Sequence, residues 1–223
     1  MIAKPAVSIA LVSLVLVGCS SYSARELPAL DRVRFSSRAE REGIGVSAEA
    51  YTDLERQQTY LDADLGSIGA IPMLVLVENT GKQSRKLSWG KIRLHTPNSK
   101  FEELAGGDVA FRLDTSPGSH SSLDAALIGR IARALVGLSQ ARSKPKRQQA
   151  RADDYKRKAL PRGVINPGET RYGFVYFLLP DKTATFTDAS LLLSLTDKSG
   201  ENAVEVAVPI KVPHFPSFSA RNS

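Results

Sequence analysis

Much of the chain alternates apolar and polar residues with a period of two, which is typical of β-strands that bury one face. The clearest alternations occupy residues 44–50, 171–179 and 204–212, and residues 189–196 predict a further strand. A weaker first strand is expected near residues 33–37. The pattern therefore predicts a mainly β protein.

Residues 71–79 differ from these strands because they are apolar at nearly every position. A short, continuous apolar run of this kind predicts a strand at the centre of a sheet. A short helical segment is expected just before it, at residues 55–61. Pro209 cannot donate a hydrogen bond, and it lies on the polar phase of the last strand, which predicts that this strand lies at an edge.

The strand expected over residues 86–96 changes phase in the middle. Leu87 and Trp89 occupy odd positions, Ile92 and Leu94 occupy even ones, and Gly90 separates the two pairs. A β-bulge at Gly90 would bring both pairs onto one face. Two short strands joined by a bend are the alternative.

Turn signals separate the predicted strands. Asn79-Thr80-Gly81 ends one strand, Asn166-Pro167-Gly168 precedes another, and residues 197–200 form a third turn. About seven short strands joined by turns predict an antiparallel β-sandwich, and an immunoglobulin-like arrangement is the most populated form. The pattern does not fix the strand order.

Residues 121–160 interrupt the strands with a predicted helical insertion. Leu127, Ile131, Leu135 and Leu138 recur at helical spacing. Lys144-Pro145 then breaks the chain, and residues 146–159 predict a second, polar helix. The apolar helix is expected to pack against the sandwich, with the second helix as a solvated face.

The insertion also contains the excess of basic residues that accounts for the net charge of the protein. The chain has a net charge of +7. Residues 142–158 contain eight basic and two acidic side chains, which equals the net +6 that remains once Lys4 is removed with a signal peptide. The eight basic residues are candidate contacts for a membrane or an acidic partner: Arg142, Lys144, Lys146, Arg147, Arg151, Lys156, Arg157 and Lys158. Binding to nucleic acid is disfavoured because Tyr155 is the only aromatic residue within 142–158.

The amino terminus begins with a different pattern. Residues 6–17 are uninterrupted apolar or small residues, too short a run to span a bilayer, which needs about 20 apolar residues. The run has the length of a signal peptide's apolar region and ends in Leu16-Val17-Gly18-Cys19. An ordinary secretory signal, cleaved elsewhere, is the alternative. Cys19 is the only cysteine, so its modification would leave no thiol for a disulfide, a metal or a nucleophile.

Residues 1–19 resemble the lipobox segment of bacterial lipoproteins. That resemblance implies that Cys19 receives a diacylglyceryl group, that residues 1–18 are removed, and that the new terminus is acylated. Two or more acyl chains anchor a protein stably, whereas one does so marginally. Ser20 after the Cys implies the outer membrane of a diderm bacterium, with the domain expected to face the periplasm.

A second resemblance concerns the domain. Residues 71–81, IPMLVLVENTG, and residues 160–177, LPRGVINPGETRYGFVYF, are similar to uncharacterised bacterial lipoproteins with an immunoglobulin-like β-sandwich. The similar positions are turn and core residues. The resemblance therefore implies a fold and assigns no activity.

Catalytic chemistry is not evident in the sequence. His95, His120 and His214 form no spaced ligand pair, and the nucleophile and phosphate-binding loop motifs are absent. Asp62 with Asp64 could bind calcium, but no ligand loop follows. Trp89 with the aromatic residues of 172–177 could line a ligand groove, although core packing explains them as well. No cofactor or metal site is predicted.

These patterns predict four segments. They are a signal peptide (1–18), a lipidated tether (19–30), a β-sandwich domain (31–215) with its helical insertion (121–160), and a tail (216–223). The expected protein is a lipid-anchored envelope lipoprotein with a structural, accessory or binding role and no catalysis. Its expected partners are the membrane and, through the insertion, anionic lipid or an acidic envelope protein. The alternatives are a membrane-contacting module that uses the insertion, or a metal-dependent envelope hydrolase.

Overall fold

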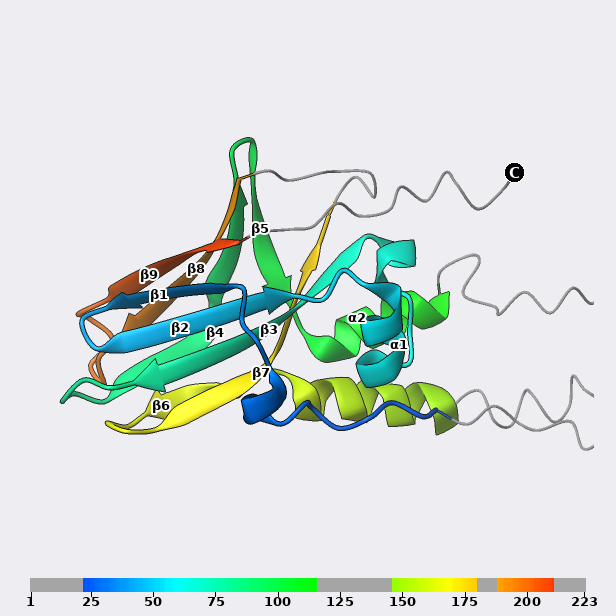
Figure 1. The fold of residues 1–223 in the computed structure, drawn as a ribbon, viewed down its shortest axis with the longest axis horizontal. Helices are drawn as coiled ribbons and strands as arrows, with labels where there is room; N and C mark the ends of the chain where they lie inside the picture. The colour runs from blue at the N-terminus through cyan, green and yellow to red at the C-terminus, as the bar shows by residue number, and fades with distance from the viewer. Residues whose placement is uncertain (1–21, 116–145, 180–187, 211–223) are drawn as a thin grey trace, which may run out of the picture.

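A computed structural model describes residues 22–115, 146–179 and 188–210. In this part of the chain the protein is mainly β, and the strands pair antiparallel (Figure 1). The strands are β1 (Ser37–Arg41), β2 (Ile44–Ala50), β3 (Ala70–Asn79), β4 (Arg85–Thr96), β5 (Ser99–Leu104), β6 (Gly163–Ile165), β7 (Thr170–Leu178), β8 (Ala189–Thr196) and β9 (Val204–Ile210). The helices are α1 (Leu54–Leu61), α2 (Gly106–Thr115), residues 146–158, and the 3₁₀ turns η1 (Leu30–Arg32) and η2 (Leu65–Ile68).

The strands form one hydrogen-bonded order, β1-β2-β3-β7-β5-β4-β8-β9, with β6 paired to β4. The last strand, β9, also lies against β1 and β2, so the sheet curls almost into a barrel (Figure 1). This continuous order does not confirm the expected two-sheet, immunoglobulin-like sandwich. The count also exceeds the predicted seven, because β5 and β6 were not expected.

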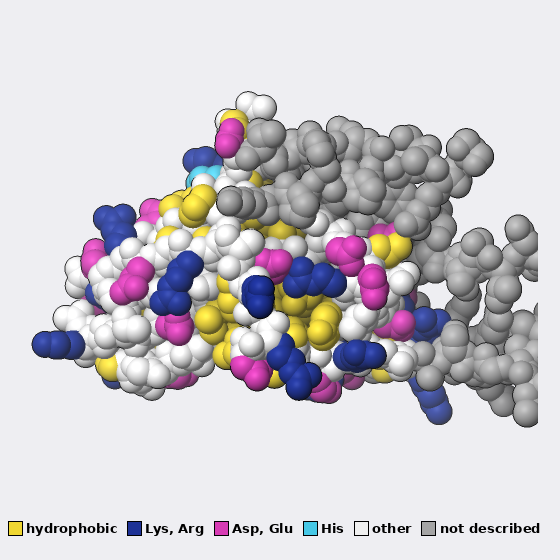
Figure 2. Space-filling view, in the orientation of Figure 1, with side chains coloured by type: hydrophobic (Ala, Val, Ile, Leu, Met, Phe, Trp, Pro, Cys, Tyr) yellow, Lys and Arg dark blue, Asp and Glu magenta, His cyan; other side chains and the backbone are white. Residues whose placement is uncertain are grey.

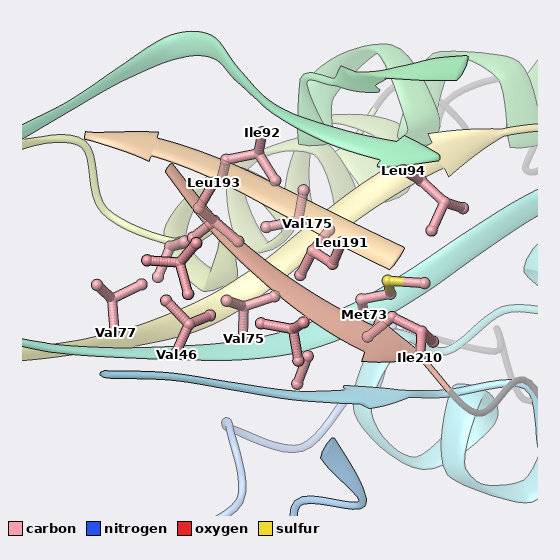
Figure 3. Close-up of a cluster of buried hydrophobic side chains, with 14 of the residues drawn as sticks. Val46, Met73, Val75, Val77, Ile92, Leu94, Val175, Leu191, Leu193 and Ile210 are labelled. Atoms are coloured by element: carbon pink, nitrogen blue, oxygen red, sulfur yellow. The ribbon is translucent and has the colours of Figure 1, made fainter. Parts of the chain in front are cut away.

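The interior of the curled sheet forms the first hydrophobic core. Val46 of β2, Val75 of β3, Val175 of β7 and Leu193 of β8 meet there with other buried aliphatic residues (Figure 3). β9 contributes Val204, Val206, Val208 and Ile210 and exposes the residues between them. Its clean alternation in the sequence therefore reflects one buried and one solvated face.

The outer face of β3 and β7 forms a second core. Leu74 of β3 and Phe174 and Tyr176 of β7 belong to this second core and pack with residues of α1, α2, the 146–158 helix and the segment that precedes β1. Figure 1 shows the helices grouped together beside the sheet. β3 is consequently buried on both faces, as its unbroken apolar sequence predicted, and it lies between β2 and β7.

Most sequence-predicted elements are present. Strands β2, β3, β4, β7, β8 and β9, helix α1 and the helical 146–158 segment are confirmed to within a few residues. The first strand begins at Ser37, later than expected, because Val33 and Phe35 pack on the second core. The predicted apolar helix within 121–138 lies outside the described residues.

The bulge at Gly90 is confirmed, with one difference. β4 is continuous, Gly90 has φ +70°, and the register with β8 shifts between Leu87 and Ile92. Both of these residues and Leu94 are fully buried. Trp89 was expected beside them but is 56% exposed, so the bulge turns this side chain out of the core.

Two glycines let the 146–160 segment approach its neighbours closely. A Cβ at Gly173 of β7 would lie 2.6 Å from the backbone nitrogen of Leu160, which donates a 2.9 Å hydrogen bond to the carbonyl of Phe174. A Cβ at Gly106 would lie 2.7 Å from the carbonyl oxygen of Tyr155. Backbone contact at both points holds the helix on the sheet.

We predict that Gly173→Ala lowers the free energy of unfolding by about 1–3 kcal/mol, because the added methyl group meets backbone that cannot move aside. Urea unfolding of the two proteins measures the difference. Gly45→Ala is the matched control, since its Cβ would meet only flexible side-chain atoms at 3.4 Å or more. Equal losses in both variants would contradict close approach as the reason for Gly173.

Candidate functional site

The 146–158 helix packs one face against the sheet. Tyr155 is fully buried, stacks on Tyr176 with ring centroids 5.7 Å apart, and donates a 2.8 Å hydrogen bond from its hydroxyl to the carbonyl of Leu61. Burial raises the pKa of Tyr155 well above its usual value, so the hydroxyl keeps its proton as a donor. The polar helix predicted from the sequence is therefore a structural part of the domain rather than only a solvated face.

Four of the eight predicted basic contacts form ion pairs within the domain. Arg147 contacts Asp62 at 3.5 Å, Arg151 contacts Asp114 at 2.6 Å, Arg157 contacts Glu26 at 2.5 Å, and Lys158 contacts Asp154 at 2.6 Å. The side chains of Arg151 and Lys158 are 10% and 1% exposed, so neither offers its charge to a surface. Lys146 and Lys156 are exposed, whereas Arg142 and Lys144 lie outside the described residues.

The surface reflects this internal pairing. On the face shown in Figure 2, Lys and Arg side chains are interspersed with Asp and Glu side chains around apolar ones. No uniform positive field therefore covers the described part of this face.

Residues 22–27 run along the same helix and were not expected to be ordered on the domain. Tyr22 donates from its hydroxyl to Asp154 at 2.5 Å, and its ring lies 5.7 Å from the guanidinium of Arg151. The backbone nitrogen of Arg25 donates to the carbonyl of Thr59 at 2.8 Å. We call Tyr22, Glu26, Arg151, Asp154, Arg157 and Lys158 the amino-terminal cluster.

Asp154 is the centre of the amino-terminal cluster. Its buried carboxylate accepts from Tyr22, Arg157 and Lys158, and Lys158 also donates to the carbonyl of Tyr60 at 2.8 Å. Burial and the hydrogen bond to Asp154 raise the pKa of Tyr22, which keeps its hydroxyl protonated. The cluster thus joins the amino-terminal segment, α1 and the 146–158 helix through one carboxylate.

We predict that Lys158→Met lowers the free energy of unfolding by about 3 kcal/mol, because it leaves the buried Asp154 carboxylate short of a partner. The neighbouring Lys156→Met should change it by less than about 0.5 kcal/mol, since Lys156 is exposed. Chemical unfolding of both variants measures the contrast. Equal values would show that burial does not distinguish the two lysines.

A second polar group occupies the bulge in β4. Glu103 of β5 accepts from the backbone nitrogen of Gly90 at 2.8 Å and forms a salt bridge with Arg162, which directly precedes β6. Trp89 covers this pair, with its ring 4.7 Å from the guanidinium carbon. We call Glu103 and Arg162 the bulge pair. The phase break indicated the bulge, but no sequence signal indicated that these two distant residues meet.

Burial of the bulge pair disfavours the charged form of both side chains. The Glu103 and Arg162 side chains are 2% and 13% exposed. Burial raises the pKa of Glu103 and lowers the pKa of Arg162, so for each group desolvation outweighs the attraction of its partner. Two nitrogens of Arg162, Nε and Nη1, are buried without a hydrogen-bond partner among the described residues.

We predict that Arg162→Met destabilises the domain by about 3–5 kcal/mol near neutral pH, because it leaves the Glu103 carboxylate buried alone. A carboxyl whose pKa is raised on folding stabilises the fold at low pH and loses that contribution as the pH rises through its folded pKa. The defect should therefore shrink as the pH is lowered from neutral to mildly acidic values. Unfolding experiments under both conditions measure it.

The double variant Glu103→Gln with Arg162→Met is the control, since Gln retains an acceptor for Gly90 and leaves no charge. Its stability should equal or exceed that of the wild type at neutral pH. A pH-independent defect in Arg162→Met would show that lost packing, not the stranded carboxylate, is responsible.

The remaining sequence candidates are not brought together in the described part of the chain. His95 lies in β4, whereas His120 and His214 fall outside the described residues. Asp62 accepts from Ser23 and pairs with Arg147, and Asp64 caps η2 through Ser67. Within 22–115, 146–179 and 188–210, no three His, Cys, Asp or Glu residues are grouped to hold a metal.

The predicted aromatic groove is also separated. Phe174, Tyr176 and Phe177 are buried in the cores, while Trp89 is exposed over the bulge pair.

Helices in the described segments are too short or too polar to cross a bilayer.

Comparisons with known proteins assign no family to the chain. No family model matches the chain, and no curated protein matches it. A solved structure, that of a functionally unknown protein from Listeria monocytogenes EGD-e, is similar with a TM-score of 0.36 and 9% identity. The match covers 79% of this chain and 82% of that one.

Proposed function

We propose that the protein is a lipid-anchored envelope lipoprotein whose domain has a structural, accessory or binding role. The observation that carries the proposal is the apolar run of residues 6–17 followed by Leu16-Val17-Gly18-Cys19. Acylation at Cys19 would hold the domain on the outer membrane, facing the periplasm, with the bilayer as its first partner. The immunoglobulin-like relationship inferred from residues 71–81 and 160–177 is part of the same proposal.

Ion pairs within the domain support a structural or accessory role. The described basic residues of the helical insertion mostly pair with acids of the domain, and the aromatic residues of β7 pack in the cores. Most of the basic and aromatic side chains that were candidates for a binding site therefore stabilise the domain itself.

A second candidate, a membrane-contacting module, is favoured by one specific observation. Arg151 contacts both Asp114, near the end of α2, and Tyr22, the first described residue. The chain thus leaves α2 for the apolar 121–138 segment, and returns from it, close to where it arrives from Cys19. On the 146–158 helix, Lys146 and Lys156 are the exposed lysines that could meet anionic lipid, at roughly 1 kcal/mol each.

We predict that mass spectrometry of the mature protein finds a triacylated Cys19 at its amino terminus, and that the protein fractionates with membranes. Cys19→Ala should lose both properties, because no other thiol can accept the lipid. A soluble protein cleaved at another residue would overturn the proposal. Salt-sensitive binding of the Cys19→Ala domain to anionic vesicles, lost on deleting residues 121–138, would instead favour the membrane-contacting module.

A further inference from the structure

Few residues separate Cys19 from the first residue that contacts the domain. A tether of residues 19–30 would reach roughly 40 Å when extended. The structure already places residues from 22 onward on the domain. Three residue steps separate Cys19 from Tyr22, and they span at most about 11 Å.

Residues 22–27 are held on the domain by hydrogen bonds and by apolar contacts, and we call this segment with its contacts the clamp. Two are charge-assisted: the hydroxyl of Tyr22 donates to the buried Asp154 carboxylate, and Arg157 donates to both oxygens of Glu26 at 2.6 and 2.5 Å. Tyr22 and Leu27 also pack on the second core. The segment is therefore held by side chains at both of its ends.

The clamp places one end of the molecule near the anchor. The backbone nitrogen of Ser23 and the guanidinium of Arg147 both contact Asp62, at 3.4 and 3.5 Å, so the exposed Lys146 lies next to the start of the segment. β3 begins directly after η2, beside α1 and α2, and runs ten residues to Asn79. The turn that contains Lys82 is thus about 30 Å away along the strand.

We propose that this clamp orients the domain on the bilayer, with the end that carries Tyr22, Asp62 and Lys146 facing the lipid headgroups and the turn at Lys82 pointing away. The inference rests on the proposed acylation of Cys19. Its occupant is an anionic phospholipid surface, which the exposed lysine at this end complements.

The test uses the full-length lipidated protein in vesicles of phosphatidylethanolamine and phosphatidylglycerol. Because acylation consumes the native thiol, Lys146→Cys and Lys82→Cys each supply a single site for a fluorophore. Lipids that carry a nitroxide on the headgroup then quench each fluorophore according to its distance from the membrane. Quenching should be several-fold stronger at position 146 than at position 82, which also holds an exposed lysine.

Two further variants separate the clamp from other causes of orientation. Inserting about twelve Gly and Ser residues after Ser20 adds roughly 20 Å of flexible reach and should remove most of the difference. Tyr22→Phe with Glu26→Gln should reduce it by releasing the segment while leaving both cores in place.

Each outcome is decisive. Equal quenching at both positions, in a protein whose mass shows an acylated Cys19, would overturn the orientation and leave the anchor standing. A difference that survives the spacer would overturn the clamp and favour direct contact by the insertion. A protein without acyl groups would overturn the proposed function, and the inference with it.

Discussion

The apolar outer face of β3 and β7 is the constraint on which the rest of the structure depends. Both strands carry large apolar side chains on both faces, so closing the sheet around its interior leaves Leu74, Phe174 and Tyr176 uncovered. Burying one such side chain contributes roughly 1.5–3 kcal/mol. The helices and the segment before β1 are arranged to supply that cover, and Gly106 and Gly173 let backbone approach closely enough to complete it.

Covering this face also determines where the charge goes. The 146–158 helix has basic side chains around most of its circumference, so packing one face inevitably brings some of them under protein. Burial of an unpaired charge is strongly unfavourable, and each buried cation of this helix accordingly meets a carboxylate. Asp114 of α2 and Asp154 of the helix itself fulfil this role for Arg151 and Lys158. The amino-terminal segment joins the same network, and so the proposed anchor and the second core are physically connected.

The bulge pair follows a different physical rule. A bulge in β4 interrupts strand pairing and leaves the amide of Gly90 to be satisfied, and Glu103 accepts from it. That carboxylate then requires a cation, which Arg162 supplies from the segment before β6. Trp89 is turned outward and shields the pair from water. One extra residue in a strand thus accounts for a buried ion pair and an exposed aromatic side chain.

The sequence by itself determined what depends on neighbouring residues: most strands through their period of two, the bulge through the phase change at Gly90, and α1 through its short polar pattern. It also predicts the anchor at Cys19, because that signal is local. Only the tertiary structure decided that the sheet curls almost into a barrel, that Glu103 meets Arg162, and that residues 22–27 lie on the helix. These features depend on contacts between residues 59 to 164 positions apart, and side-chain periodicity carries no information about such distances.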